Sequence, residues 1–522
     1  MHCIIPRWMY TVLCIWTVLP LQSTIFYVDP TTGDMSNDGS YEQPWRTLEE
    51  VIEGNLLRTQ SYLPLPYNES SVLVPKNDDA PVQPGDTIML RTGYHGSVFY
   101  RGAYMKDYLT IMAEPGHQPV IGNVHLRAAR RFIFDGVIFS PEGDETFYYA
   151  TLFLLESHSH HGPAGHVILR NCTLYGTYDS SDWGIEEWND VGDCIVIKGD
   201  SSLIENNVCK NVREGINLFG PYNQAISNQF INFSRDGMRG QGNHLLFEGN
   251  VIKNSYNVND NHDDAFQSFS TGDTIRDVTL RGNTVINFED PDQPFKGALQ
   301  GFGCFDGPYA DWVIENNLIV TNHFHGITIQ GAHRCTIQNN TIIDIDLANV
   351  PNGTWLRVAD SKDGATGSNN LVQNNISMGL QLNESVTSYH NEIVDDYEDF
   401  MDVTGLDLRL TTSSPLGGAG RLEGAPSKDL LQRERLNDGL IDLGAIESPG
   451  LIECSQEDIL VLKNMGNQSY QYIDGSFKVL GPTLVMPLSY NHIHITESFD
   501  VMSSFEILNN TELQLVLTGC DD

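Results

Sequence analysis

The 522-residue sequence predicts an all-β protein built as a solenoid, a parallel β-helix whose coils take about 22 residues each. A short phrase centred on asparagine recurs along the chain, and it is flanked by short strands of aliphatic and β-branched residues. The 47 glycines suit a turn-rich β protein better than a helical one. Because 40% of the residues are hydrophobic and only 19% are charged, the chain can bury a large core and is not expected to be disordered.

The recurring phrase consists of a few apolar residues, one or two polar residues and an asparagine, followed by another apolar strand. Its steps are either about 22 residues or one such step plus an insertion, which is the signature of a solenoid. We expect the asparagines to lie in matching turns, to point inward and to hydrogen-bond one another along the axis. For Asn171 and Asn375 this expectation takes precedence over the glycosylation signal that both also match. The asparagines of the phrase are Asn171, Asn207, Asn228, Asn250, Asn283, Asn317, Asn340 and Asn375.

The N-terminus has the character of a secretion signal. Arg7 is the only charge before Thr24, and the apolar run from Met9 to Leu21 is too short for a comfortable membrane span. We therefore expect residues 1–23 to be a cleaved signal peptide, residues 24–450 to form the β-helix domain and residues 451–522 to form a small C-terminal β module. No other run is long and apolar enough to span a membrane, so we expect an extracellular protein. A capped solenoid needs no partner, which favours a monomer.

The clearest helix in the sequence lies near the start of the predicted β-helix domain. Thr47 and Glu50 have the spacing of a capping box, and Leu48, Val51 and Ile52 form an apolar stripe. A short amphipathic helix of this kind would cover the open end of a solenoid, which otherwise exposes a strand edge.

The segments around this helix resemble a known family. Phe26-Tyr-Val-Asp-Pro30, Pro44-Trp45 and Pro84-Gly-Asp-Thr-Ile88 are similar to the N-terminal segment of secreted right-handed parallel β-helix proteins of the pectin-lyase-like superfamily. Asp442-Leu-Gly-Ala-Ile-Glu447 resembles the phrase that often closes such domains. The resemblance implies a single right-handed parallel β-helix from Phe26 to Glu447. It does not specify an activity, because the superfamily includes lyases, epimerases, glycoside hydrolases and proteins that are not enzymes.

Two cysteines leave with the signal peptide, so seven of the nine remain, which is an odd number. No CxxC pair occurs, and a zinc site is therefore unsupported. Cys454 and Cys520 are a candidate disulfide in the C-terminal module. Cys194 lies in an apolar strand and is interpreted as a buried hydrophobic residue.

The strands that precede the asparagine phrases can be aligned coil by coil. The third position is always apolar and is expected to point into the core, so the first, fourth and sixth positions face outward. This outward face combines carboxylates, amides and aromatic rings, which are the groups that sugar recognition requires. We therefore predict a groove that binds an extracellular polysaccharide. The aligned strands are 193–198, 214–219, 236–241, 264–269, 297–302 and 325–330, and the predicted substrate-binding residues are Glu214, Asn217, Asp236, Gln241, Gln267, Phe269, Gln300, Phe302 and Gln330.

The sharpest local motif is Asp260-Asn-His262-Asp263-Asp264. It resembles the Asp-Pro-His-Asp/Glu motif of alginate (mannuronan) C5-epimerases, with Asn261 in place of proline. The resemblance implies removal of the C5 proton of a uronate, by an epimerase or a polysaccharide lyase.

That chemistry needs a base and a group that neutralises the neighbouring carboxylate. His262 or His325 could act as the base, and Arg239 could hold the substrate carboxylate. Asp236, Asp263 and Asp264 could bind Ca²⁺ through oxygen ligands. The predicted catalytic residues are His262, Asp264, Arg239, His325 and Asp260.

Two other functions remain open. Asp236 with Asp264, or Glu214 with Asp264, could form the carboxyl pair of an inverting glycoside hydrolase, because matching positions in neighbouring coils are about 5 Å apart. The chain could also be a glycan-binding or structural β-helix without catalytic activity.

The formal charge of −38, from 68 acidic and 30 basic residues, disfavours nucleic acid and anionic membranes as partners. It also opposes a polyuronate substrate unless Ca²⁺ or a local cation compensates.

Overall fold

A computed structural model describes residues 23–143, 149–287, 289, 292–344, 353–435 and 439–448, together with the backbone of eight short strands between residues 460 and 517. The chain divides into two compact units, Met1–Ser448 and Pro449–Asp522. The predicted signal peptide, Cys454 and Cys520 lie outside the described residues.

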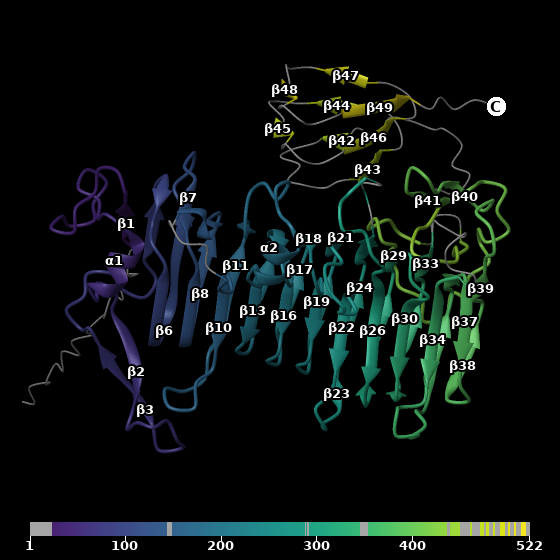
Figure 1. Ribbon diagram of the computed structural model, residues 1–522, viewed down its shortest axis with the longest axis horizontal. Coiled ribbons are helices and arrows are strands. Elements are labelled where there is room, and N and C mark those ends of the chain that lie inside the picture. The colour runs from purple at the N-terminus through teal and green to yellow at the C-terminus, as the bar shows by residue number, and fades with distance from the viewer. Residues whose placement is uncertain are drawn as a thin grey trace, which may run out of the picture. The chain divides into compact units, whose positions relative to one another are not determined.

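The first unit is a parallel β-helix in which most coils contribute one strand to each of three rows (Figure 1). The first and second rows form one continuous sheet, because β6 (Val98–Ala113) and β8 (Val124–Asp135) run through both, and the antiparallel hairpin of β2 (Thr59–Leu63) and β3 (Val72–Lys76) joins it at β6 to give 24 strands. The third row is a 12-stranded sheet. The strands are short and rich in β-branched and aliphatic residues, as expected for parallel strands covered on one face by a core.

The outer face of the first row carries most of the predicted site. After β6 and β8, the first row contains β10 (Phe153–Glu156), β13 (Ile195–Lys198), β16 (Ile216–Leu218), β19 (Met238–Gly240), β22 (Asp264–Phe269), β26 (Gln300–Asp306), β30 (His325–Gln330), β34 (Trp355–Ala359) and β37 (Gly379–Leu382). The second row contains β1 (Ile25–Val28), β4 (Thr87–Leu90), β11 (Gly165–Arg170), β14 (Leu203–Glu205), β17 (Gln224–Ile226), β20 (Leu246–Glu248), β24 (Thr279–Arg281), β28 (Val313–Glu315), β32 (Thr336–Gln338), β35 (Asn370–Gln373) and β38 (Val386–Tyr389).

The third row closes each coil behind the core. It contains β5 (Gly93–Tyr94), β7 (Pro119–Ile121), β9 (Ile138–Phe139), β12 (Thr173–Tyr175), β15 (Val208–Val212), β18 (Gln229–Phe233), β21 (Val251–Ser255), β25 (Thr284–Ile286), β29 (Leu318–Val320), β33 (Thr341–Ile343), β36 (Ile376–Ser377) and β39 (Glu392–Ile393).

A ladder of buried asparagines runs along the turn between the second and third rows, as the sequence predicted. In each step the side-chain oxygen of one asparagine accepts from the backbone N–H and the side-chain amide of the asparagine one coil before it; Asn250 and Asn283 show this at 3.0 Å for both bonds. The seven steps are 21, 22, 33, 34, 23, 35 and 16 residues long. The ladder comprises Asn207, Asn228, Asn250, Asn283, Asn317, Asn340, Asn375 and Asn391.

Asn171 does not belong to this ladder, and the prediction for it was wrong. Its side chain is exposed and its φ is +55°, the left-handed conformation that asparagine and glycine adopt most easily. Asn206 and Asn316 occupy the same turn position, with φ of +54° and +55°. Asn171 is therefore equivalent to the first asparagine of each Asn-Asn pair, and Cys172 takes the position of the second, where its N–H donates to Asn207 Oδ1.

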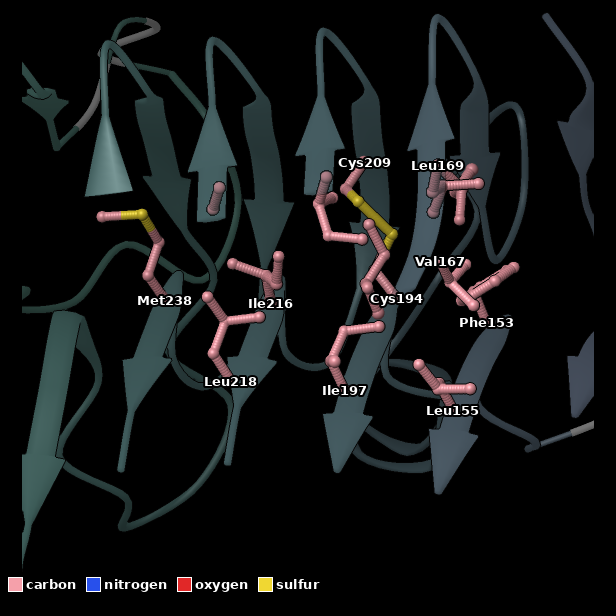
Figure 2. Close-up of a cluster of buried hydrophobic side chains, with 14 of the residues drawn as sticks. Phe153, Leu155, Val167, Leu169, Cys194, Ile197, Cys209, Ile216, Leu218 and Met238 are labelled. Atoms are coloured by element: carbon pink, nitrogen blue, oxygen red, sulfur yellow. A yellow bond between two sulfur atoms is a disulfide. The ribbon is translucent and has the colours of Figure 1, made fainter. Parts of the chain in front are cut away.

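The interior is filled by inward-pointing side chains from all three rows, such as Phe153, Val167 and Ile216 in Figure 2. Cys194 is buried in this core, but it is not a free hydrophobic residue as predicted: it forms a disulfide with Cys209 (Figure 2). The two cysteines lie 15 residues apart on opposite sides of one coil. Cys172, Cys304 and Cys335 are buried free thiols.

Each end of the first unit is covered by a different segment. The predicted N-terminal helix is confirmed as α1 (Leu48–Glu53), with Thr47 as its N-cap and with Leu48, Val51 and Ile52 buried. Near the other end, the buried Arg435 donates to Glu447 at 2.9 Å and to Asn316 at 2.7 Å. These bonds hold the segment of residues 442–447 against the coil that contains Asn316.

The remaining short elements lie in the connections. They are β2 (Thr59–Leu63), β3 (Val72–Lys76), the 3-10 turn Pro141–Gly143, α2 (Ile185–Asp190), β23 (Ile275–Arg276), β27 (Tyr309–Ala310), β31 (Ala332–His333), β40 (Phe400–Asp402) and β41 (Asp407–Leu410).

The second unit consists of short strands that pair in parallel as three small sheets. The strands are β42 (Leu460–Val461), β43 (Tyr470–Ile473), β44 (Phe477–Val479), β45 (Leu484–Val485), β46 (Asn491–Ile495), β47 (Phe499–Val501), β48 (Glu506–Ile507) and β49 (Leu513–Leu517). Across the described parts of the chain, neither helix has the length and apolar character needed to cross a membrane.

Candidate functional site

Three acidic side chains stand at matching positions in successive coils, at or just before the starts of β16, β19 and β22. The register of these strands aligns Glu214, Asp236 and Asp264, each two residues ahead of a core residue. We call these three residues the acid column. All are buried, with exposed fractions of 3%, 2% and 1%. Because neighbouring coils lie about 4.8 Å apart, each carboxyl group is close to the next one in the column.

Arg239 binds the acid column from the outer face. Its guanidinium donates to Glu214 at 3.2 Å and also to Asp236, and Arg235 forms a second ion pair with Glu214 at 3.0 Å. Asn217 donates to the other oxygen of Glu214 at 2.7 Å. Arg239 is thus held by two carboxylates of its own chain, which leaves it poorly placed for the predicted bidentate grip on a substrate carboxylate.

Asp264 has the least satisfied carboxyl group of the column. Gln267 donates to its Oδ2 at 2.9 Å, and its backbone N–H donates to Asp236 Oδ1 at 3.1 Å. Its Oδ1 is buried and has no hydrogen-bond partner among the residues that the structure describes. A side chain at Gly303 would overlap that oxygen and the ring of Phe305. A residue without a Cβ is therefore required here, and Phe305 lies close to Asp264 in the next coil.

Burial raises the pKa values of these acids. The pKa of Asp236 rises to about 6, because burial and the nearby Glu214 outweigh the attraction of Arg239. Burial and the charge of Asp236 raise the pKa of Asp264 well above its ordinary range. Two acids that interact this closely share protons as a pair, and the unpartnered Asp264 favours the protonated form.

The structure separates the motif 260–264 into an exposed part and a buried part. Asp260 and His262 are exposed on the loop before β22. Asp263 is buried and accepts from Ser255 at 2.8 Å and from Asn257 at 3.2 Å, so it points away from the outer face. Burial raises the pKa of Asp263 to about 7. Only Asp264 of this motif joins the acid column.

His325 begins β30 in the same row. The indole N–H of Trp355 lies 3.2 Å from its Nδ1, and Thr328 Oγ1 lies 2.8 Å from the same nitrogen. Because an indole N–H can only donate, this contact favours the tautomer that carries its proton on Nε2. Burial, with His323 and Arg357 nearby, lowers the pKa of His325 to about 4. At neutral pH the ring is therefore uncharged and offers an N–H donor rather than a base.

The predicted alignment of residues 297–302 is displaced by three residues. Phe302, rather than Leu299, pairs with Phe266, and Gln300 pairs with Asp264. Phe302 has an exposed fraction of 0%, so the prediction that it faces outward was wrong. The error has a simple source, because Gly-Ala-Leu and Gln-Gly-Phe both fit the pattern of a small residue followed by an inward apolar one. Gln300 is buried beside Asp264 and does not stand level with Arg239 and Gln267.

The register in the structure adds residues to the outer face of the first row that the sequence did not predict there. Gly303 stands level with Gln267, and Arg357 stands level with Thr328. Arg357 is partly exposed, lies over the Trp355 ring at 5.9 Å and forms no ion pair within the described residues. The alternation in Trp355-Leu-Arg357-Val-Ala indicates a strand with Arg357 on its outer face. Because a long insertion precedes this strand, the coil-by-coil alignment of the sequence ended before it. Gln241, Phe269 and Gln330 are partly exposed on the predicted face.

The predicted calcium ligands do not form a recognisable metal site. Among the residues that the structure describes, no three His, Cys, Asp or Glu side chains converge closely enough to hold a metal ion. Calcium binding by Asp236, Asp263 and Asp264 stays a prediction, and the chemistry considered for the acid column does not require it.

Comparisons with known proteins agree with the fold. A family model described as right handed beta helix region matches residues 160–342, and one described as periplasmic copper-binding protein (NosD) matches residues 303–417. No curated protein matches the chain. The match to the right handed beta helix region confirms the predicted right-handed parallel β-helix.

Several solved structures are similar to this chain. Pectate lyase Pel9A is 15% identical with a TM-score of 0.41, over 82% of this chain and 97% of that one. The complex of XylC with xylose is 9% identical with a TM-score of 0.40, over 68% and 76%. The PL6 family alginate lyase AlyGC is 13% identical with a TM-score of 0.37, over 83% and 68%. At these identities the likeness concerns the fold alone.

Proposed function

We propose that this chain is a carbohydrate-active protein that binds an extracellular glycan along the outer face of the first row and acts on it through the acid column. Gln241, Phe269 and Gln330 supply partly exposed amide and aromatic side chains on that face. Such side chains stack on sugar rings and hydrogen-bond hydroxyl groups. The N-terminal secretion signal that the sequence predicts is in keeping with an extracellular substrate.

The observation that carries the proposal is the buried Asp264 with its unpartnered Oδ1. Burial and the charge of Asp236 raise the pKa of Asp264 well above its ordinary range, and a carboxyl group with a raised pKa is suited to donate a proton to a glycosidic oxygen. An ionised neighbour, Asp236 or Glu214, would then act as the base that activates water. The geometry therefore favours glycoside hydrolysis through paired carboxyl groups over the other chemistries that the sequence left open.

Removal of a C5 proton from a uronate is the second candidate, and one observation supports it. Arg357 is a partly exposed cation on the outer face without an ion pair in the described residues, and it could neutralise a uronate carboxylate. His262 is exposed and close enough to lower the pKa values of His323 and His325, which makes it the better base of the two predicted histidines. The tautomer of His325 argues against a base at that position.

The test is incubation of the full chain with neutral glycans, pectate and alginate. New reducing ends alone indicate hydrolysis, ultraviolet absorption of an unsaturated uronate indicates a lyase, and deuterium uptake at C5 without cleavage indicates an epimerase. We expect Asp264→Asn to lower the rate at least about 100-fold.

Asp193→Asn is the matched control, because Asp193 has the same position one coil before Glu214, outside the acid column, and is paired with Arg213 at 2.9 Å. Full activity in Asp264→Asn would contradict the acid column as the site. Glycan binding without any turnover would favour a non-catalytic binding protein.

A further inference from the structure

A cleft of about 450 Å³ opens at the C-terminal ends of β16, β19 and β22, the strands whose starts carry the acid column. It lies between Phe219, Gln241 and Phe269 on one side and residues 270–275, which lead into β23, on the other. Figure 1 shows β23 directly after β22. The volume falls within the range of about 300–1,000 Å³ that is usual for small-molecule sites.

Two aromatic rings stand at matching positions of the cleft. Phe219 and Phe269 are both partly exposed, and they belong to coils separated by the coil of Gln241. Two coil steps amount to about 9–10 Å, which leaves room for a flat sugar ring between them. The amide nitrogen of Gln241 donates to the Phe269 carbonyl at 3.2 Å, so its carbonyl oxygen can accept from a ligand hydroxyl.

The rim of the cleft is polar, and its charge is negative. Asn243, Thr271 and Asp273 are exposed around the opening. Among the described residues that line the cleft, none is a lysine or arginine, and Asp273 is the only charged one. Arg239 lies 6.0 Å from the Phe269 ring, but it is held by Glu214 and Asp236. A ligand carboxylate would therefore meet repulsion here without a compensating cation.

We propose that this cleft is a subsite for one neutral pyranose unit of the substrate, held between Phe219 and Phe269 and oriented by Gln241. The inference rests on the proposed function, because Phe269 ends the strand that Asp264 begins, so the cleft and the acid column lie at opposite ends of β22 on the same face. It names a substrate feature: a glycan with a neutral sugar at this position, rather than a uniform polyuronate.

The test is ligand-observed NMR with the full chain at neutral pH. The probes are the methyl glycosides of glucose, galactose and xylose, and the methyl glycosides of glucuronic and galacturonic acid. We expect saturation transfer and a measurable Kd for at least one neutral glycoside, and weaker binding of the uronides. Phe219→Ala and Phe269→Ala should each weaken binding about two- to tenfold.

Phe99→Ala is the matched control, because Phe99 is an exposed phenylalanine of the first row that does not line the cleft. Gln241→Ala provides a second variant if loss of a phenylalanine disturbs folding, and it should weaken the neutral glycoside in the same way. Equal or tighter binding of the uronides, no binding of any neutral glycoside, or unchanged affinity in the cleft variants would each overturn the proposal.

Asp264→Asn separates this inference from the proposed function. The Asp264 carboxyl group does not line the cleft, so the variant should bind the neutral glycoside like the wild type. Asp264-dependent turnover without neutral-glycoside binding would overturn the cleft alone. Neutral-glycoside binding by a chain whose turnover does not depend on Asp264 would overturn the acid column alone.

Discussion

Asp263 and Asp264 are neighbours with opposite surroundings, because successive residues of an extended segment point to opposite sides. Asp263 turns inward to Ser255 and Asn257, whereas Asp264 joins the acid column. Both are buried, and both have raised pKa values. The two residues can therefore be tested separately, one through stability and the other through catalysis.

The stability of the protein should depend on pH through Asp263. Its pKa is about 7 in the folded protein, against an ordinary value of 3.8, so the folded state binds the proton more tightly than the unfolded state does. The stabilisation from that proton is full below pH 4 and is lost as the pH rises towards 7. Between pH 5 and pH 8 this residue should cost the folded state roughly 2–3 kcal/mol.

Urea unfolding of the wild type and of Asp263→Asn at pH 5 and pH 8 checks this expectation. The asparagine oxygen can still accept from Ser255 and Asn257. The variant should gain stability relative to the wild type at pH 8 and much less at pH 5. The same difference at both pH values would contradict a buried, proton-binding Asp263.

Single residues of the site were only partly predictable from the sequence. The acid column was found because its members precede core residues by a fixed spacing. The partners of Arg239, the tautomer of His325 and the need for glycine at position 303 depend on side chains from neighbouring coils. No local pattern in the sequence records those contacts, so they required the fold.

At the level of elements, the asparagine ladder ties each coil to the next. Asn283 donates to the Phe247 carbonyl and to Asn317, and it accepts from both amide groups of Asn250. Asn283→Ala would leave a backbone carbonyl and a backbone N–H buried without partners. We expect a loss of about 2–4 kcal/mol in the free energy of unfolding, measured in urea.

Asn206→Gly is the control for this prediction. Asn206 is exposed, with φ of +54°, and glycine adopts that conformation easily. Its replacement should change stability by less than about 1 kcal/mol. An equal effect of the two substitutions would mean that the buried ladder has no special role.

The elements themselves followed closely from the sequence, and the exceptions have physical causes. The ladder was predicted from Asn207 onward, because each buried asparagine repeats at coil spacing. Asn171 was misassigned because the left-handed turn position also favours asparagine. The disulfide between Cys194 and Cys209 was missed because their proximity arises only when the coil closes.

On the scale of the whole molecule, the two units should be separable. The chain divides into units at residue 448, and the described apolar clusters of the first unit extend from Phe26 to Ile446. A chain of residues 23–448 should therefore fold, retain the β circular dichroism of this unit and unfold cooperatively. An insoluble or disordered product would contradict the predicted boundary near residue 450.

The spacing between coils would determine how many sugar units of the proposed glycan the outer face contacts. A step of about 4.8 Å between coils is close to the length of one pyranose unit. If the glycan of the proposed function lies along the axis, it advances by about one sugar for each coil, so that successive coils contact successive sugar units. Insertion or removal of one complete coil would lengthen or shorten the stretch of glycan in contact with the protein by one sugar. The asparagine ladder would stay in register.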